Sequence, residues 1–84
     1  LAATEMAPDL PKAHLNLGNV LLAHSDPHKA LAAYARALQL QPDYAPAHFN
    51  SGNALIALSR YPEAIQCYRS ALSADPAFVD AWVA

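Results

Sequence analysis

The chain has 84 residues and a formal net charge of −2, and 55% of its residues are hydrophobic although only 8% are aromatic. This length accommodates at most one small domain. The lysine and arginine residues, 5 in all, are scattered along the chain, which argues against a surface for nucleic acid or an anionic membrane. No apolar run approaches the roughly 20 residues that a membrane-spanning helix needs, and no signal peptide is recognisable.

The first elements in chain order are helical. Residues 1–7 are predicted to end a helix, which Pro8 closes because proline interrupts helical hydrogen bonding. A second helix is predicted over residues 11–24, where leucines recur at helical spacing. Asp26 can then cap a new helix, and Pro27 is tolerated in its first turn.

Three further helices complete this pattern. Residues 27–40 are predicted to form a helix that ends before Pro42, and residues 45–58 and 61–74 are predicted to form the next two. In the helices at 27–40 and 61–74 the apolar residues follow the i, i+4, i+7 spacing of amphipathic helices. The sequence therefore predicts an all-α fold of antiparallel helical hairpins.

The two hairpins are copies of one unit of 34 residues. Aligning residues 11–44 with residues 45–78 without a gap gives 13 identities in 34 positions, too many for unrelated hairpins. In this register residues 1–10 end a preceding repeat, and residues 79–84 start a further one. Because the chain starts and stops inside repeats, and begins with Leu1, we expect it to be a piece of a longer protein.

The period and the motif positions resemble the tetratricopeptide repeat. The matching positions of the two units are Gly18 and Gly52, Ala30 and Ala64, Tyr34 and Tyr68, Ala37 and Ala71, and Pro42 and Pro76. The resemblance implies a solenoid with a right-handed superhelix, in which the first helix of each hairpin lines a concave surface. It also implies a role in protein–protein interaction.

Two positions depart from the family pattern. His14 and His48 stand where a tryptophan or a similarly large residue is usual, which should loosen the packing there. Ser51 replaces an apolar residue. Otherwise we expect Gly18 to face Ala30 and to bring the helices of the hairpin close together.

Paired asparagines, three residues apart, mark the first helix of each hairpin. Asparagine is a mediocre helix former, but its amide can both donate to and accept from an extended peptide backbone. The resemblance therefore implies a groove that binds an extended peptide or a partner helix. The predicted groove residues are Lys12, Leu15, Asn16, Asn19, Leu22, Ala23, Pro46, Phe49, Asn50, Asn53, Ile56 and Ala57.

An alternative gives the asparagines a structural role, in which they only hydrogen-bond between adjacent helices. For Asn19 and Asn53 the two roles are equally supported, whereas we favour a ligand role for Asn16 and Asn50. Leu17 is expected to pack inside the hairpin while its neighbour Leu15 faces the groove.

Two subfamilies offer more specific comparisons. The lysine of the carboxylate clamp in chaperone-binding repeats would fall at Leu15 or Phe49, and it is absent. The repeats are more similar to those of O-linked N-acetylglucosamine transferases and SPINDLY-type proteins, whose asparagine ladder falls at Asn16 and Asn50. This resemblance implies an alternative function, a substrate-recruiting arm of a glycosyltransferase. A third possibility is a scaffold that self-assembles through exposed repeat ends.

No catalytic residue, metal site or cofactor is predicted, so the segment itself is not expected to be an enzyme. His14 and His48 belong to separate hairpins, and the break at Pro27 separates His24 from His28, so zinc-type ligand spacing is absent. The single cysteine cannot form an internal disulfide, which favours a reducing, cytoplasmic location.

Overall fold

The computed structural model describes residues 10–75, and this part of the chain forms four α-helices and no strand. These helices are α2 (Pro11–Ala23), α3 (Pro27–Leu40), α4 (Ala45–Ala57) and α5 (Tyr61–Ala74). The predicted helices agree with them to within one residue at each end. The expected repeat ends at residues 1–9 and 79–84 lie outside the described residues.

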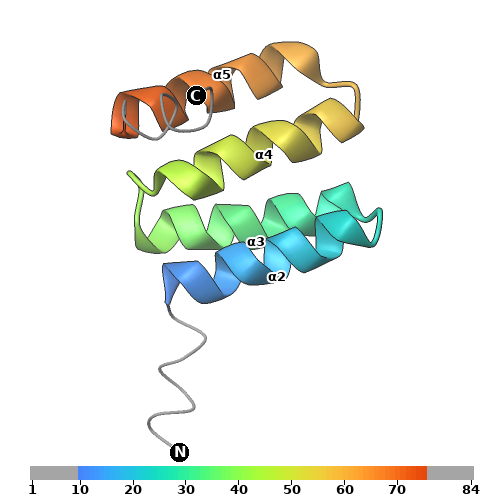
Figure 1. Ribbon diagram of the computed structural model, residues 1–84, viewed down its shortest axis with the longest axis horizontal. Helices are drawn as coiled ribbons and strands as arrows, with labels where there is room; N and C mark the ends of the chain where they lie inside the picture. The colour runs from blue at the N-terminus through green and yellow to red at the C-terminus, as the bar shows by residue number, and fades with distance from the viewer. Residues whose placement is uncertain (1–9, 76–84) are drawn as a thin grey trace, which may run out of the picture.

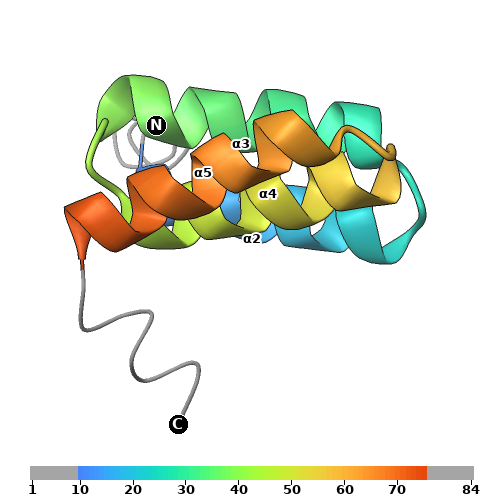
Figure 2. The ribbon, with the colours of Figure 1, turned by 90° about the horizontal axis from the view of Figure 1, so that it is seen from above.

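Consecutive helices run antiparallel and pack in chain order (Figure 1). α2 pairs with α3 and α4 pairs with α5, and the contact between α3 and α4 joins the two hairpins. Seen from above, α2 and α4 lie on one side of the molecule and α3 on the other (Figure 2). The all-α helical-repeat fold expected from the sequence is therefore present.

The turns inside the two hairpins have the same pattern of backbone hydrogen bonds. The backbone N–H of Asp26 donates to the carbonyl of Leu21 (2.9 Å), and the N–H of Arg60 donates to that of Leu55 (2.8 Å). These bonds are typical of a Schellman motif, which needs a left-handed residue just beyond the helix. Ser25 and Ser59 occupy that position, with φ of 63° and 62°. Both turns therefore hold a residue with a side chain in a conformation that favours glycine.

The helix starts match the capping signals. The side chain of Asp26 accepts a hydrogen bond from the backbone N–H of Lys29 at 3.4 Å. Its counterpart Arg60 gives no side-chain cap to α5. Instead the guanidinium of Arg60 forms two hydrogen bonds, of 2.6 and 2.5 Å, with the carboxylate of Glu63. This exposed pair contributes little to stability.

The core between the helices is built from alanines around one large side chain. Tyr34 is fully buried, the only large side chain in the part of the chain described here with that degree of burial. It shares a cluster with Leu15 and with alanines from α3 and α4, namely Ala30, Ala37, Ala47 and Ala54. Such small residues let helix backbones approach closely, so the tyrosine ring fills most of the remaining space.

The ring of Tyr34 lies directly on the backbone of Gly18. A Cβ atom at Gly18 would overlap this ring, at 2.7 Å from Cδ1 and even closer to Cε1. In the second hairpin, a Cβ at Gly52 would lie 2.6 Å from Cε1 of Tyr68. The glycine therefore makes room for the tyrosine ring, and its expected contact with Ala30 stays a prediction.

Replacing either turn serine with glycine should stabilise the protein. Glycine reaches positive φ without the cost of roughly 1–2 kcal/mol that a Cβ imposes, and this gain exceeds the entropy that glycine loses on folding. We expect Ser25→Gly and Ser59→Gly each to raise the free energy of unfolding by about 0.5–1 kcal/mol in urea denaturation. Ser70→Gly, at an exposed helical position, is the matched control and should lower it; equal effects at all three sites would contradict this account.

The two glycine positions should differ in their tolerance of alanine. Overpacking a closed core costs about 1–3 kcal/mol, and at Gly18 the ring of Tyr34 is enclosed on all sides. The ring of Tyr68 is half-buried and has room to tilt, while alanine favours the helix by about 1 kcal/mol. Gly18→Ala should therefore lower the free energy of unfolding by about 1–2 kcal/mol more than Gly52→Ala. Chemical denaturation of both variants measures the difference, and equal stabilities would refute the packing assignment.

Candidate functional site

The asparagines of the first helices belong to a hydrogen-bonded chain that repeats with the hairpins. The hydroxyl of Tyr34 donates to Oδ1 of Asn19 at 2.6 Å, and the hydroxyl of Tyr68 donates to Oδ1 of Asn53, also at 2.6 Å. Oδ1 of Asn19 accepts a second bond, from Nδ2 of Asn50, at 2.9 Å. The last bond joins α2 to α4, so the network crosses from one repeat to the next.

The tyrosine hydroxyls hold their protons in these bonds. Burial raises the pKa of Tyr34 above its ordinary value. Burial, and then the nearby Cys67, raise the pKa of Tyr68. Each hydroxyl therefore stays a neutral donor, which orients the carboxamide of its asparagine with the oxygen toward the tyrosine.

The structural role foreseen as an alternative is therefore present for Asn19 and Asn53, whose oxygens are used inside the protein. The two tyrosine hydroxyls were not among the residues predicted to form the site. A signal was available, because both repeats carry tyrosine, not phenylalanine, 15 residues after the second asparagine.

The predicted groove residues differ widely in exposure. Those exposed to solvent are Lys12, Asn16, Asn19, Ala23, Ile56 and Ala57, and those half-buried are Leu22, Pro46, Phe49, Asn50 and Asn53. Only Leu15 is buried, at 9% exposure, and it belongs to the same core cluster as Tyr34. Leu15 therefore offers little surface to a ligand.

The expected division between Leu15 and Leu17 is wrong in this structure. Leu17, assigned to packing, is 51% exposed, whereas its counterpart Ser51 is buried. Leu15 instead points inward like its counterpart Phe49. The ring centroid of Phe49 lies 5.3 Å from that of Tyr68, and the two rings make an angle of 50°. This position faces the tyrosine of its own hairpin, and that contact draws the side chain inward.

The first helices lie closer to each other than the second helices do. α2 contacts α4 directly, and α3 does not approach α5 to the same extent. The side of the molecule that carries α2 and α4 is therefore the inner side of the stack. It presents Asn16 and Asn50 at equivalent positions of neighbouring repeats.

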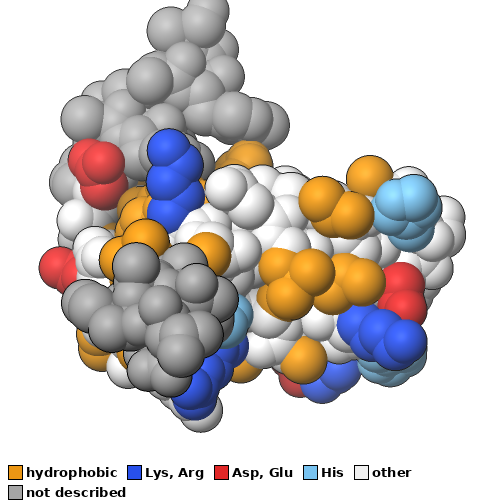
Figure 3. All heavy atoms as spheres, turned by 90° about the horizontal axis from the view of Figure 1, so that it is seen from below, with side chains coloured by type: hydrophobic (Ala, Val, Ile, Leu, Met, Phe, Trp, Pro, Cys, Tyr) orange, Lys and Arg blue, Asp and Glu red, His pale blue; other side chains and the backbone are white. Residues whose placement is uncertain are grey.

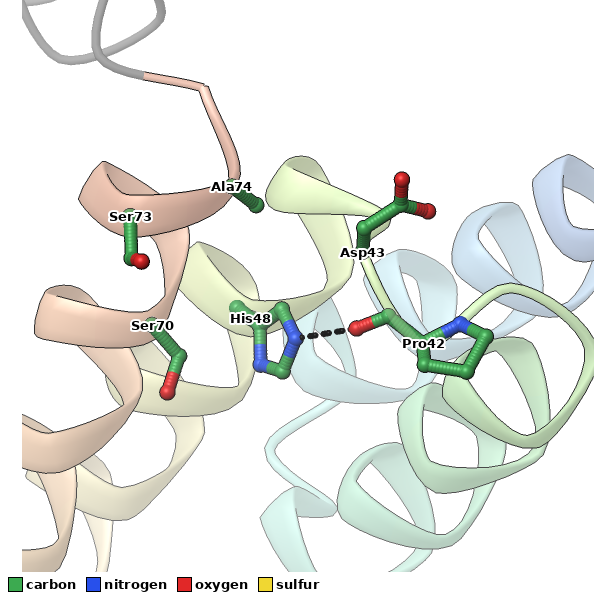
Figure 4. A pocket seen from close by; sticks show the side chains of 6 residues that line it. All are labelled: Pro42, Asp43, His48, Ser70, Ser73 and Ala74. Atoms are coloured by element: carbon green, nitrogen blue, oxygen red, sulfur yellow. Dashed lines mark hydrogen bonds between the residues drawn. The ribbon is translucent and has the colours of Figure 1, made fainter.

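The histidine at the motif position has a bond of its own. Nε2 of His48 lies 2.8 Å from the carbonyl oxygen of Pro42, in the loop between α3 and α4. Since a carbonyl only accepts, Nε2 carries the proton. His48 also borders a shallow hollow between this loop and the end of α5 (Figure 4), lined by Pro42, Asp43, His48, Ser70, Ser73 and Ala74. His48, which was expected to loosen the packing, therefore links α4 to the loop between α3 and α4 through a hydrogen bond.

Its counterpart His14 differs. Nε2 of His14 is buried and has no hydrogen-bond partner within residues 10–75. In residues 10–75 no group of three histidine, cysteine, aspartate or glutamate side chains lies close enough together to hold a metal ion.

Cys67 is half-buried on α5. Burial, and then the charge of Glu63, raise the pKa of its thiol. A thiol with a raised pKa is a poor nucleophile because little thiolate is present, so its environment does not favour catalysis.

The tight turn, the glycine under a tyrosine ring and the asparagine bonded to that tyrosine all recur at the 34-residue period. A protein-family model for the tetratricopeptide repeat matches residues 15–78, more than half of the chain. The chain belongs to the tetratricopeptide repeat family. Such repeats generally mediate protein–protein interactions and are typically non-catalytic. A search of curated proteins found no match. Within residues 10–75 of this tetratricopeptide repeat protein, no helix is long and apolar enough to cross a membrane.

The bond between Tyr34 and Asn19 should contribute measurably to folding. A partly buried hydrogen bond is worth about 0.5–1.5 kcal/mol net. A double-mutant cycle of Tyr34→Phe and Asn19→Ala should therefore give a coupling energy of about 1 kcal/mol in urea denaturation. The control is a second cycle that combines Tyr34→Phe with Gln39→Ala on the same helix. Its two changes in the free energy of unfolding should be additive. Additivity in both cycles would show that the bond does not support the fold.

Proposed function

We propose that the chain is a protein–protein interaction module that binds an extended peptide or a partner helix along the surface of α2 and α4. The observation that carries this proposal is the hydrogen bond between Asn50 and Asn19. It uses one N–H of the Asn50 amide and fixes the plane of that amide. The Oδ1 atom and the second N–H of Asn50 are then oriented in advance for a ligand, which lowers the entropy lost on binding.

Asn16 supplies the equivalent amide one repeat earlier. Its side chain is exposed and takes part in none of the hydrogen bonds that the structure shows among residues 10–75. Two amides at the same position of successive first helices match the repeating donors and acceptors of an extended backbone. This recognition does not depend on the side chains of the peptide, so it is tolerant of sequence.

The surroundings of the amides favour a peptide of mixed character. Phe49 is half-buried and provides an aromatic contact, Ile56 is 41% exposed, and Lys12 adds an exposed positive charge near the start of α2. A peptide with apolar side chains and a nearby carboxylate would suit this set. Leu15 contributes through the core that supports the surface.

The role as a recruiting arm of a glycosyltransferase is a narrower version of the same proposal. It depends on the similarity of Asn16 and Asn50 to the asparagine ladder of O-linked N-acetylglucosamine transferases. A nucleotide-sugar-binding domain in the same open reading frame would support it, and its absence from the full-length gene would exclude it.

The proposal is tested with peptides selected from a random library on the immobilised chain. Loss of one hydrogen bond corresponds to about 1 kcal/mol, or roughly fivefold in Kd. Asn16→Ala should therefore weaken binding of a selected peptide about fivefold in isothermal titration calorimetry, and the variant with Asn50→Ala added should weaken it further.

Gln66→Ala is the matched control, because it removes an exposed carboxamide from a second helix. It should leave the affinity unchanged, and circular dichroism should show the same helicity in all variants. If the double asparagine variant binds the peptide with unaltered affinity, the proposed peptide-binding surface on α2 and α4 is refuted.

A further inference from the structure

The hollow beside His48 is a feature that the proposed peptide-binding surface does not use. The loop between α3 and α4 borders it on one side and the end of α5 on the other, with His48 between them (Figure 4). Its volume is about 460 Å³, a size typical of sites for small organic groups. His48 lies about 200° around α4 from Asn50, because successive helical residues are about 100° apart. The hollow and the asparagines therefore belong to different sides of α4.

The hollow exists because the end of α5 carries short side chains. Its three lining residues there are each shorter than the residue one period of 34 earlier, since Ser70, Ser73 and Ala74 stand where the first repeat has Arg36, Gln39 and Leu40. In that first repeat, Nη1 of Arg36 donates to Oε1 of Gln39 at 3.2 Å. The first repeat thus supplies a guanidinium group from its own second helix, and the second repeat leaves the same position open.

The hollow is not a face on which a following repeat would pack. Ile65 and Leu72 stand one period after Leu31 and Leu38, which pack against the core cluster, so a following repeat would cover that side of α5. Ser70 lies about 200° around α5 from Leu72. A following repeat would therefore leave the hollow open.

The groups that border the hollow are mainly hydrogen-bond acceptors. Since Nε2 of His48 carries the proton donated to Pro42, Nδ1 of the neutral ring is an acceptor, and it faces α5 and the side chain of Ser70 (Figure 4). The carboxylate of Asp43 is exposed at the rim and forms no ion pair within residues 10–75. The hydroxyls of Ser70 and Ser73 can accept as well.

The helix ends around the hollow also favour a cation. α5 ends at Ala74 without a basic residue in its last turn, so its last carbonyls and the negative end of its dipole are not neutralised by a side chain. The start of α4 adjoins the hollow, but the N–H groups of Ala47 and His48 are already bonded to the carbonyl of Tyr44. They offer no donors to an anion.

Positive charge elsewhere on the chain does not oppose a basic partner. Arg69 is exposed on α5 and is not among the residues that line the hollow. On the face shown in Figure 3, the described lysine and arginine side chains are spread out and not gathered in one patch. The formal net charge of the chain is −2, so long-range electrostatics favour a basic partner.

We propose that this hollow receives an arginine side chain of a partner protein. A guanidinium group is planar and carries five N–H donors, so it can bond the carboxylate of Asp43 at the rim together with Nδ1 of His48 and a serine hydroxyl inside. It would occupy the position that Arg36 occupies in the first repeat. A protein side chain suits an open, shallow hollow, because the partner adds contacts around it that a free cation lacks. This proposal does not depend on peptide binding along α2 and α4.

The probe for this site is the peptide acetyl-Gly-Arg-Gly-amide, titrated into ¹⁵N-labelled chain. Saturable shifts are expected at the backbone amides of Asp43, His48, Ser70 and Ser73, with Kd on the order of millimolar, as for a single anchoring contact. The same peptide with citrulline in place of arginine keeps the shape and loses the charge, so it should bind about fivefold more weakly. The lysine peptide should also bind more weakly, because an ammonium has fewer donors and no planar fork.

Two variants, each with a matched control, test the assignment. Asp43→Asn should weaken binding of the arginine peptide about threefold. Asp26→Asn removes the same charge at the far end of the hairpin, where asparagine caps a helix as well as aspartate, and should leave the affinity unchanged.

The double variant Ser70→Arg with Ser73→Gln restores the residues of the first repeat and should abolish the saturable shifts. Ala32→Arg adds the same charge at an exposed position of α3 and should bind like wild type. Circular dichroism should show equal helicity for all variants.

Four results would each overturn the proposal: no saturable shifts at the hollow, equal affinity for the citrulline or lysine peptide, equal effects of Asp43→Asn and Asp26→Asn, or persistent binding by the double variant. Shifts confined to Asn16 and Asn50 would overturn it too, because they place the peptide on the other side of α4.

Discussion

The fold depends on the seating of one tyrosine ring against one glycine. The ring of Tyr34 occupies the space that a side chain on Gly18 would fill, which brings its hydroxyl within reach of Asn19, the next residue of α2. The same arrangement recurs with Gly52 and Tyr68. A single steric requirement therefore sets the separation of the two helices and the orientation of the asparagine amide.

The same constraint sets up the hydrogen bond that joins one repeat to the next. Asn19 is held by its own tyrosine and receives the amide of Asn50 from the next repeat, so the packing of one hairpin fixes a surface group of the following one. Solenoids generally derive their stability from neighbour contacts. Here the neighbour contact also orients the amide of Asn50, which connects core packing to the proposed recognition of a ligand.

The periodic features of the fold could be predicted from the sequence. Prolines and Asp26 placed the helix starts, and the 34-residue identities fixed the repeat register. The left-handed serines at positions 25 and 59 could not be predicted, because serine carries no strong preference for that conformation and the chain lacks the glycine that would mark it. The partner of Gly18 was also missed, since a sequence motif gives the small residue without the group that fills the space beside it.

For the candidate site, the residue types were more predictable than their exposure. The asparagine pairs were visible as an unusual choice for a helix, and the inner surface followed from the family resemblance. Leu15 and Leu17 were assigned to the wrong environments, because helical periodicity places both near the boundary of the buried face. Which of the two is covered depends on the neighbouring helix, and α2 has its neighbour on one side only in the part of the chain described here.

The central claim is that the surface of α2 and α4 recognises a ligand through the amides of Asn16 and Asn50, the second of which is oriented by its bond to Asn19. The most direct measurement is the titration of ¹⁵N-labelled chain with a library-selected peptide, followed through the side-chain amide resonances. The account predicts the largest chemical-shift changes at Asn16 and Asn50, with little change at Gln66 on α5. Changes concentrated on α5 or in the hairpin turns, with Asn16 and Asn50 unaffected, would contradict it.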